Sequence, residues 1–492
     1  MPYGWLRDAT QRQPDRVALV HAGVSVTYGE LLRATRAMIG VLREWGIEPG
    51  DHVATQMAGT PEYVAALCAV DGAGAALLPL DPTLKAGEVD AYCQRAGVRL
   101  VVVEPDKPGE QSPGGVPRRA APCLVELARM QGLRPEDEGP WPPEAARYVL
   151  MLMSSGTTGR PKIVPRTRRE LHGALRVENA AMPLREEDRL LGALPLFHGA
   201  GLFKALLGCL TQACTLYLQP FSPRGAVRTI EREGITVLKG APLIYRSLAE
   251  TEFSALPRLG TLRLATSGTA MQPRQVAQVL RRKFGVRLTI DYGSTEAATA
   301  TAGLPLADDP GTGWVGRPLP GVTVEVWGAD GERLPAGQEG QVVVKSPGAA
   351  SCYLDDPEAT ASTFREGFVL TGDIGYRTPG GDLHLVGRQK EMISVAGKKV
   401  SPAEVEDVLR QHPQVSEALV MPEREADGDE VVSAYVECVG ELTPGILRTF
   451  CAERLAPFKA PRRVKFVDRL PRSATGKVLR RAPDCSKGGS GR

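Results

Sequence analysis

The first third of the chain alternates helical and strand patterns, which is typical of an α/β fold with a largely parallel sheet. Thr27 and Glu30 have the spacing of a capping box, and apolar residues at helical spacing follow them as far as Gly46. Thr60–Pro61 offers a second helix start, and the apolar residues 100–103 predict a buried strand. The chain is therefore expected to begin with helices packed on a sheet.

The length of 492 residues predicts more than one domain. A boundary is predicted near residues 387–390, because a compact α+β segment of about 100 residues starts there. Ser401, the proline after it and a glutamate at capping-box spacing mark the first helix of this segment. The Gly- and Ser-rich residues 484–492 are expected to be a disordered tail. We expect a large α/β N-terminal domain and a small α+β C-terminal domain.

The charges nearly balance, with 60 basic and 57 acidic residues and a net charge of +3. This balance excludes a nucleic-acid or membrane footprint spread over the whole surface. Residues 457–492 contain 11 basic and two acidic residues, a local excess of nine positive charges. That excess fits either an attraction for anionic ligands or a solvated face.

The nine cysteines are scattered without a C-x-x-C pair, which is typical of free thiols in a reducing cytosol. The first residues show no signal-peptide pattern, and the most apolar run, residues 64–80, is interrupted by Asp71. We therefore expect a soluble cytoplasmic protein with no membrane span.

The strongest local motif is the Ser-, Thr- and Gly-rich run from Ser154 to Lys162. Small hydroxyl residues, two glycines and a lysine suit a loop whose backbone N–H groups wrap a polyphosphate. The run is not a Walker loop, because Pro161 stands where that motif needs glycine. It predicts a phosphate-binding loop of another kind.

Further motifs follow this loop along the chain, and the whole set resembles the adenylate-forming superfamily. That superfamily includes acyl- and aryl-coenzyme A synthetases, adenylation domains of nonribosomal peptide synthetases and firefly luciferase. The matching segments are residues 194–198, 265–269, 291–296, 371–373, 387–391 and 471–477. The resemblance implies an ATP- and acyl-binding domain at 1–387, a hinge at 388–390 and a mobile lid domain at 391–483.

The nucleotide-binding residues that the resemblance implies divide by the part of ATP that they contact. The phosphate residues are Ser154, Ser155, Gly156, Thr157, Thr158, Gly159 and Lys162. The adenine and ribose residues are Gly268, Thr269, Asp291, Tyr292, Gly293, Ser294, Asp373 and Arg388. Glu296 is the expected Mg²⁺ ligand, since this ion takes only one or two protein carboxylates beside phosphate oxygens. The expected cofactors are ATP and Mg²⁺, with coenzyme A as co-substrate.

The residues expected at the reacting atoms are Lys477, Thr295 and His198. Lys477 lies on a loop of the lid domain, where its cation would touch both the acid's carboxylate and the α-phosphate. Lys390 falls at the hinge position of the family. Ser394 and Gly397 belong to the loop that lines the tunnel for the thiol.

The acyl pocket is expected at Phe197, His198, Gly199, Gly201 and Ala297. His198 stands where amino-acid-activating members place an aspartate for the substrate ammonium, which disfavours α-amino acids. The small residues favour an aryl or medium acyl group. Lys204 and Lys239 are expected to be surface lysines rather than partners of a second carboxylate.

The chain is thus expected to be an AMP-forming acyl/aryl-CoA synthetase, which makes an acyl adenylate, releases pyrophosphate and then forms a thioester. The acceptor is coenzyme A or, alternatively, a phosphopantetheinyl carrier protein, because Lys398 stands where the family's thiol loop commonly has an acidic residue. Luciferase-like oxygenation shares the same motifs. A nicotinamide oxidoreductase is disfavoured, since Gly199 and Gly201 lack a third glycine at position 204. A non-catalytic relative is disfavoured by the presence of Lys477 and Glu296.

Overall fold

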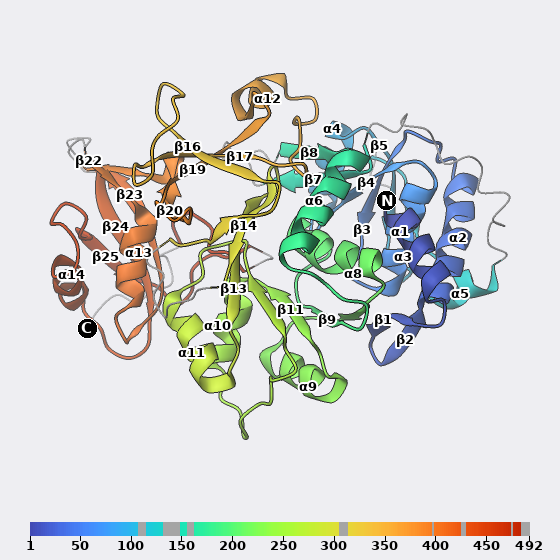
Figure 1. The fold of residues 1–492 in the computed structure, drawn as a ribbon, viewed down its shortest axis with the longest axis horizontal. Helices are drawn as coiled ribbons and strands as arrows, with labels where there is room; N and C mark the ends of the chain where they lie inside the picture. The colour runs from blue at the N-terminus through green and yellow to red at the C-terminus, as the bar shows by residue number, and fades with distance from the viewer. Residues whose placement is uncertain are drawn as a thin grey trace.

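The computed structural model describes residues 1–106, 115–130, 148–154, 162–304, 313–395, 398–424, 430–473 and 476–483. Within these ranges, two large sheets with helices packed on them form most of the N-terminal part (Figure 1). The C-terminal unit lies at the opposite end of the molecule from the N-terminus, beside β14 and α10 (Figure 1). The predicted fold class, a large α/β part followed by a smaller α+β part, is confirmed.

The nine-stranded sheet has the order β15-β14-β13-β12-β11-β9-β10-β1-β2. The inner strands, from β13 to β1, run parallel, and antiparallel strands close both edges. Its strands are β1 (Val17–His21), β2 (Val24–Thr27), β9 (Arg189–Gly192), β10 (Thr215–Leu218), β11 (Val237–Gly240), β12 (Leu264–Ser267), β13 (Leu288–Ser294), β14 (Ala298–Gly303) and β15 (Arg317–Pro318). Parallel strands bring their carboxyl ends to one edge, which is where ligands bind in such sheets.

The six-stranded sheet has the order β6-β5-β3-β4-β7-β8 and is parallel except for the β7–β8 pair. Its strands are β3 (His52–Gln56), β4 (Ala76–Pro79), β5 (Val98–Val103), β6 (Arg118–Ala120), β7 (Leu150–Ser154) and β8 (Lys162–Arg166). Apolar residues of both large sheets and of the helices around them share one buried cluster. The two sheets are therefore parts of one packed body.

The helices of the N-terminal part are α1 (Pro2–Arg12), α2 (Tyr28–Glu44), α3 (Pro61–Gly72), α4 (Ala86–Arg95), α5 (Leu124–Arg129), α6 (Arg168–Ala181), α7 (Gly199–Gly201), η2 (Leu202–Leu207), α8 (Gly208–Gln212), α9 (Pro223–Glu233), α10 (Pro242–Glu250), α11 (Arg274–Phe284) and α12 (Pro357–Thr363). The capping box predicted before α2 is formed in both directions, between Thr27 and Glu30. Thr60 caps α3 as predicted, by accepting the N–H of Tyr63. No helix in the described ranges is long and apolar enough to cross a membrane.

An antiparallel sheet follows, with β16 (Thr323–Trp327), β17 (Gly340–Lys345), β18 (Phe364–Arg365), β19 (Phe368–Arg377) and β20 (Leu383–Arg388). The short helix η3 (Gln389–Glu391) leads from it into the C-terminal unit. That unit contains β21 (Ile393–Val395), β22 (Lys398–Val400), α13 (Pro402–Arg410), β23 (Val415–Arg424), β24 (Glu430–Cys438), α14 (Pro444–Ala452) and β25 (Arg463–Phe466). Its apolar residues form a separate buried cluster.

The helix start predicted at Ser401 is only partly as expected. Ser401 Oγ accepts the N–H of Glu404 at 3.3 Å, so the cap itself is formed. The Glu404 carboxylate instead binds Lys459, with both oxygens 2.7 Å from the ammonium. Lys459, which follows α14, therefore binds the carboxylate that would have formed the reciprocal half of the predicted box. The predicted tail, residues 484–492, lies outside the described residues.

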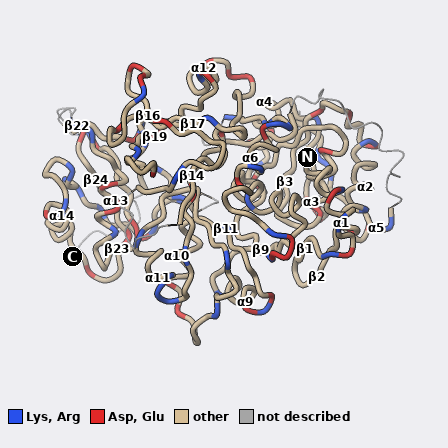
Figure 2. Tube along the Cα trace, viewed as in Figure 1, with Lys and Arg blue, Asp and Glu red and all other residues tan. Residues whose placement is uncertain are grey.

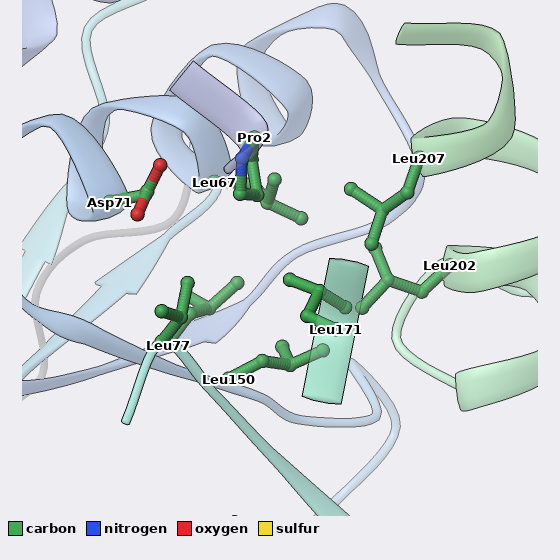
Figure 3. Close-up of a pocket in the computed structure, with 9 residues that line it drawn as sticks. Pro2, Leu67, Asp71, Leu77, Leu150, Leu171, Leu202 and Leu207 are labelled. Atoms are coloured by element: carbon green, nitrogen blue, oxygen red, sulfur yellow. The ribbon is translucent and has the colours of Figure 1, made fainter. Parts of the chain in front are cut away.

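A small cavity of about 10 Å³ lies between α1, α3, α6 and η2 (Figure 3). Its lining is apolar except for Asp71, which accepts the backbone N–H of Tyr3 at 3.0 Å. None of the predicted site residues lines it. A void of this size, just large enough for one water, is a packing gap rather than a substrate pocket.

Candidate active site

The predicted ribose residue Asp373 lies between two partners from different strands. Its Oδ2 accepts the hydroxyl of Tyr292 on β13 at 2.7 Å, and its Oδ1 is 2.9 Å from Nε of Arg388, the cross-strand neighbour on β20. Burial raises the pKa of Tyr292, and the Asp373 carboxylate raises it further. Burial opposes the charge of Arg388, but Asp373 holds the pKa of Arg388 above its usual value. The fold thus brings together three of the residues predicted to bind adenine and ribose.

The turn after β13 carries the predicted metal ligand. The N–H of Ala297 donates to Ser294 Oγ at 3.0 Å, which fixes the turn from within. The Glu296 carboxylate accepts the hydroxyl of Tyr353 at 2.9 Å through Oε1. Lys162 Nζ lies 4.5 Å from the centre of the same Tyr353 ring. Tyr353 therefore contacts both the predicted metal ligand, through its hydroxyl, and the lysine that ends the phosphate loop, through its ring.

The donor set around Glu296 suits Mg²⁺ that arrives with ATP. Oε2 of Glu296 makes no hydrogen bond to any residue that the structure describes, so it is available to a cation. The described residues contain no group of three or more His, Cys, Asp or Glu side chains that could hold a metal alone. One carboxylate completed by phosphate oxygens and water is how Mg²⁺ is usually bound beside nucleotides.

Arg166 is a residue of this site whose role the sequence did not reveal. It lies at the end of β8 with 1% exposure, and it donates to the backbone oxygens of Gly348, Thr295 and Glu296. Burial lowers its pKa to about 10, and the carboxylates of Glu170 and Glu296 act in the opposite direction. Arg166 therefore fixes the backbone of the Thr295–Glu296 turn. No local pattern could indicate this role, because the acceptors of Arg166 lie 129 to 182 residues away in the chain.

The predicted acyl segment begins a continuous helical run. His198 caps α7, since its Nδ1 accepts the N–H of Ala200 at 3.2 Å. A Cβ at Gly201 would overlap the carbonyl of Pro195, so only glycine fits there. The run continues as the π-helix η2, a form that often marks functional sites. Burial lowers the pKa of His198, and the positive charges of Lys204 and Lys477 lower it further.

The prediction that Lys204 and Lys239 are surface lysines is wrong. They are 8% and 2% exposed, respectively. Lys204 forms an ion pair with Asp291, and Lys239 Nζ lies 2.8 Å from Glu178 Oε1. Each lysine is buried because a carboxylate from another strand or helix neutralises it, which a solvated lysine would not need. Asp291, predicted to face adenine, is thus engaged on one oxygen by Lys204.

Lys477 approaches this site from the C-terminal unit. Its backbone N–H donates to Ser473 Oγ at 3.2 Å, within a turn closed by the Arg472–Val478 bridge. Its side chain keeps contact with solvent, yet the protein around it removes enough hydration to lower its pKa. Arg388 lowers that pKa further, whereas Glu391 and Asp373 raise it. The charge of Lys477 therefore interacts with those of Asp373 and Arg388, and it lowers the pKa of His198.

The C-terminal unit is held in this position by contacts on α10. Arg246 forms an ion pair with Glu417 of β23 and donates to the backbone oxygen of Ser416 at 3.4 Å. Burial opposes the ionisation of Glu417, but Arg410 and Arg246 lower its pKa to about 2. Gly476 packs against Leu243 so closely that a Cβ would overlap it. The contact thus combines a buried ion pair with a close approach of the two units at Gly476, where a larger residue would overlap Leu243.

The basic residues of the C-terminal segment are largely neutralised in pairs. Figure 2 shows acidic and basic residues interspersed in this unit. The pairs are Lys459 with Glu404, Arg463 and Lys465 with Glu423, Arg472 with Glu417 and Glu437, and Arg480 with Glu391 and Glu406. Within the described residues, ion pairs of the unit itself therefore neutralise most of the local excess of positive charge.

The residues predicted for the hinge and the thiol loop follow the nucleotide residue Arg388 in the sequence. Lys390 lies in η3 with an exposed side chain. The N–H of Ser394 on β21 donates to Glu430 at 2.9 Å, and Ser394 makes no hydrogen bond to a predicted nucleotide residue that the structure describes. Residues 155–159 of the phosphate loop, and Gly397, lie outside the described residues.

This fold and these residues define a protein of the adenylate-forming class. The chain belongs to the AMP-binding enzyme family, whose model matches residues 6–354, and the model of the AMP-binding enzyme C-terminal domain matches residues 404–477. It is 32% identical over 481 residues to a feruloyl-CoA synthase of an Amycolatopsis species, covering 97% of each chain.

Solved structures of one relative resemble the chain to different degrees. The o-succinylbenzoate coenzyme A synthetase of Bacillus subtilis in complex with AMP is 28% identical and superposes with a TM-score of 0.89 over 99% of each chain. A variant of that enzyme bound to its product analogue OSB-NCoA is also 28% identical and covers 97% of each chain, but its TM-score is 0.72. The present arrangement is thus closer to the AMP complex.

Proposed function

We propose that the chain is an AMP-forming acid:coenzyme A ligase. Its acid attacks the α-phosphate of ATP, the bond to pyrophosphate breaks, and the acyl adenylate forms. The thiol of coenzyme A then attacks the acyl carbonyl, and AMP leaves with the electron pair of the broken acyl–phosphate bond. The observation that carries the proposal is the contact of Asp373 with both Tyr292 and Arg388, with Glu296 on the turn that follows the strand of Tyr292.

Each step has a group suited to it. Asp373 and Tyr292 would bind and orient the nucleoside, with Arg388 holding the Asp373 carboxylate in place. Lys162 and Lys477 would stabilise the charge that develops as carboxylate and phosphate approach each other. Glu296 would hold Mg²⁺, which supplies neutralisation of the phosphate charges when it is bound. Thr295 and the phosphate-loop residues would donate hydrogen bonds to the same oxygens.

The two half-reactions are proposed to use two positions of the C-terminal unit. The division is 1–387, a hinge at 388–390 that includes Lys390, and the lid at 391–483. Two arrangements are supported by the lower similarity to the relative bound to a coenzyme A product analogue. In the second position Lys477 would leave, and the loop with Ser394 and Gly397 would line the path of the thiol.

The contact between Arg246 and Glu417 gives a test of the present arrangement. We expect Arg246→Met to slow acyl-adenylate formation roughly tenfold, because the contact that docks the C-terminal unit is lost while Glu417 keeps Arg410. Thioester formation from supplied acyl adenylate should keep its rate. Both rates are measured separately, with Arg232→Met as the control, since Arg232 pairs with Glu233 on the surface. Equal slowing of both halves would contradict the docking role.

The proposed reaction is tested by pyrophosphate release with ATP and Mg²⁺ across a panel of acids, with and without coenzyme A. The panel contains aryl acids, medium-chain acids and α-amino acids. We expect continuous turnover only with coenzyme A, with aryl or medium acyl acids favoured and α-amino acids inactive. Release of one equivalent that coenzyme A does not accelerate would assign the acceptor to a carrier protein. The absence of acid-dependent pyrophosphate release would refute the adenylation chemistry.

A cytoplasmic location remains part of the proposal and is supported by the free cysteines among the described residues.

A further inference from the structure

Two buried ion pairs, Lys239 with Glu178 and Lys204 with Asp291, differ in one respect. In the first pair, Glu178 is satisfied on both oxygens, by Lys239 at 2.8 Å and by the hydroxyl of Thr299 at 3.2 Å. In the second pair, Lys204 binds Asp291 Oδ1, but Asp291 Oδ2 has no hydrogen-bond partner in the described part of the chain. The Asp291 side chain is only 2% exposed. We call the first pair closed, because both carboxylate oxygens of Glu178 have partners, and the second pair open, because Asp291 Oδ2 has none among the described residues.

The lysine of the open pair lies on the helical run that begins with the predicted acyl-pocket residues. Lys204 belongs to the helical run that starts at His198, and its charge lowers the pKa of His198. Both Asp291 Oδ1 and Lys204 Nζ pack against Gly268, where a Cβ would overlap them. Buried polar atoms without a partner are rare in folded proteins, and an acceptor left open beside a substrate site has a ligand as its natural partner.

We propose that Asp291 and Lys204 bind a hydroxyl group carried by the acid substrate, and that the enzyme therefore acts on hydroxy acids, aryl ones above all. This inference rests on the proposed ligase function. It assigns Asp291 to the acid in place of the adenine contact that the family resemblance implies.

A hydroxyl group is the group that matches both charges. It donates its proton to Asp291 Oδ2 and accepts an N–H from the Lys204 ammonium, which makes no other hydrogen bond among the described residues. A second carboxylate would face the Asp291 carboxylate, and an ammonium would face Lys204, so each meets a like charge. A plain C–H would leave Asp291 Oδ2 buried and unpaired.

The test compares matched acids that differ by one group. The probes are benzoate with its 3- and 4-hydroxy forms, cinnamate with 4-hydroxycinnamate, and benzoates with a 4-carboxyl or 4-aminomethyl group. We expect kcat/KM for pyrophosphate release to be roughly 10- to 100-fold higher for the hydroxy member of at least one pair. The carboxyl and aminomethyl acids should be poorer than the unsubstituted acid. Equal rates within every pair would overturn the proposal.

The variants remove both charges of one pair together, because a single substitution would leave the other charge buried alone. In Lys204→Met with Asp291→Asn, the preference for the hydroxy acid should fall to within about threefold. The control is Lys239→Met with Glu178→Gln, which removes the closed pair and should keep the preference. A preference that survives in the first double variant would show that another group recognises the hydroxyl, and would overturn the assignment.

Binding measured by calorimetry in the absence of ATP separates this inference from the reaction. The wild-type protein should bind the hydroxy acid more tightly than its matched partner by a similar factor. Pyrophosphate release without any preference would overturn the inference alone. A binding preference without pyrophosphate release would refute the proposed ligase and support the hydroxyl site. Absence of both would overturn both.

Discussion

Replacing Lys477 with alanine is expected to slow acyl-adenylate formation by roughly 10²- to 10³-fold, the usual effect of removing a group that stabilises charge in the transition state. In the present arrangement its charge interacts with those of Asp373 and Arg388 and lowers the pKa of His198. If the lysine leaves the site before the thiol attacks, thioester formation from supplied acyl adenylate should keep its rate within about threefold.

The two half-reactions are therefore assayed separately, by pyrophosphate release and by thioester formation. Lys459→Ala is the matched control, because Lys459 lies in the same unit and is neutralised by both oxygens of Glu404. A similar loss in both half-reactions would show that Lys477 supports the structure rather than the first reaction.

The pH dependence of the adenylation rate gives a second test of the role of Lys477. Because loss of hydration and the charge of Arg388 lower the pKa of Lys477, its cation is lost at a lower pH than that of an ordinary lysine. With rising pH, the adenylation rate should accordingly begin to fall at a lower pH than the one at which a fully hydrated lysine loses its proton. In Lys477→Arg, which stays charged, the remaining activity should not show this decline.

Arg166→Met is expected to have the second largest effect, on both stability and catalysis. The variant leaves the backbone oxygens of Thr295, Glu296 and Gly348 without their donor, and each buried unsatisfied group costs about 1–3 kcal/mol. Because the freed turn carries Glu296, the Mg²⁺ concentration needed for half-maximal pyrophosphate release should rise roughly tenfold.

Thermal unfolding and Mg²⁺ titration of the rate are measured on the same samples. Arg169→Met is the control, since Arg169 is exposed in the same segment. Arg166→Lys keeps the charge but has a single nitrogen where the guanidinium reaches several acceptors, so it should recover only part of the Mg²⁺ response. A lowered melting temperature with an unchanged Mg²⁺ response would limit Arg166 to a structural role.

Local signals in the sequence predicted what depends on neighbouring residues. The capping box at Thr27, the cap at Thr60 and the strand at residues 100–103 involve hydrogen bonds or periodicity over a few residues, and all are formed. The resemblance added Asp373, Arg388 and Tyr292, which the structure brings into contact. The half-formed box at Ser401 shows the limit, because a distant lysine competes for Glu404.

The buried charges could not be predicted in the same way. A lysine in an apolar stretch looks the same whether it reaches solvent or a buried carboxylate, and the partner decides between the two. Lys204 and Asp291 are 87 residues apart in the chain, and Lys239 and Glu178 are 61 apart. Arg166 differs again, because its acceptors are backbone oxygens, which every residue carries and no side-chain pattern reveals.

The π-helical stretch from Leu202 to Leu207 has a consequence for how such a site can change in evolution. A π-helical turn holds one residue more than an α-helical turn, so the loss of one residue there would restore regular winding. His198 and Gly201 before this stretch and α8 after it would then keep nearly the same relative rotation, whereas the loss of one residue from a regular α-helix would turn one side by about 100°. A single deletion could thus change the side chains of this one turn, while the groups on either side of it keep their places.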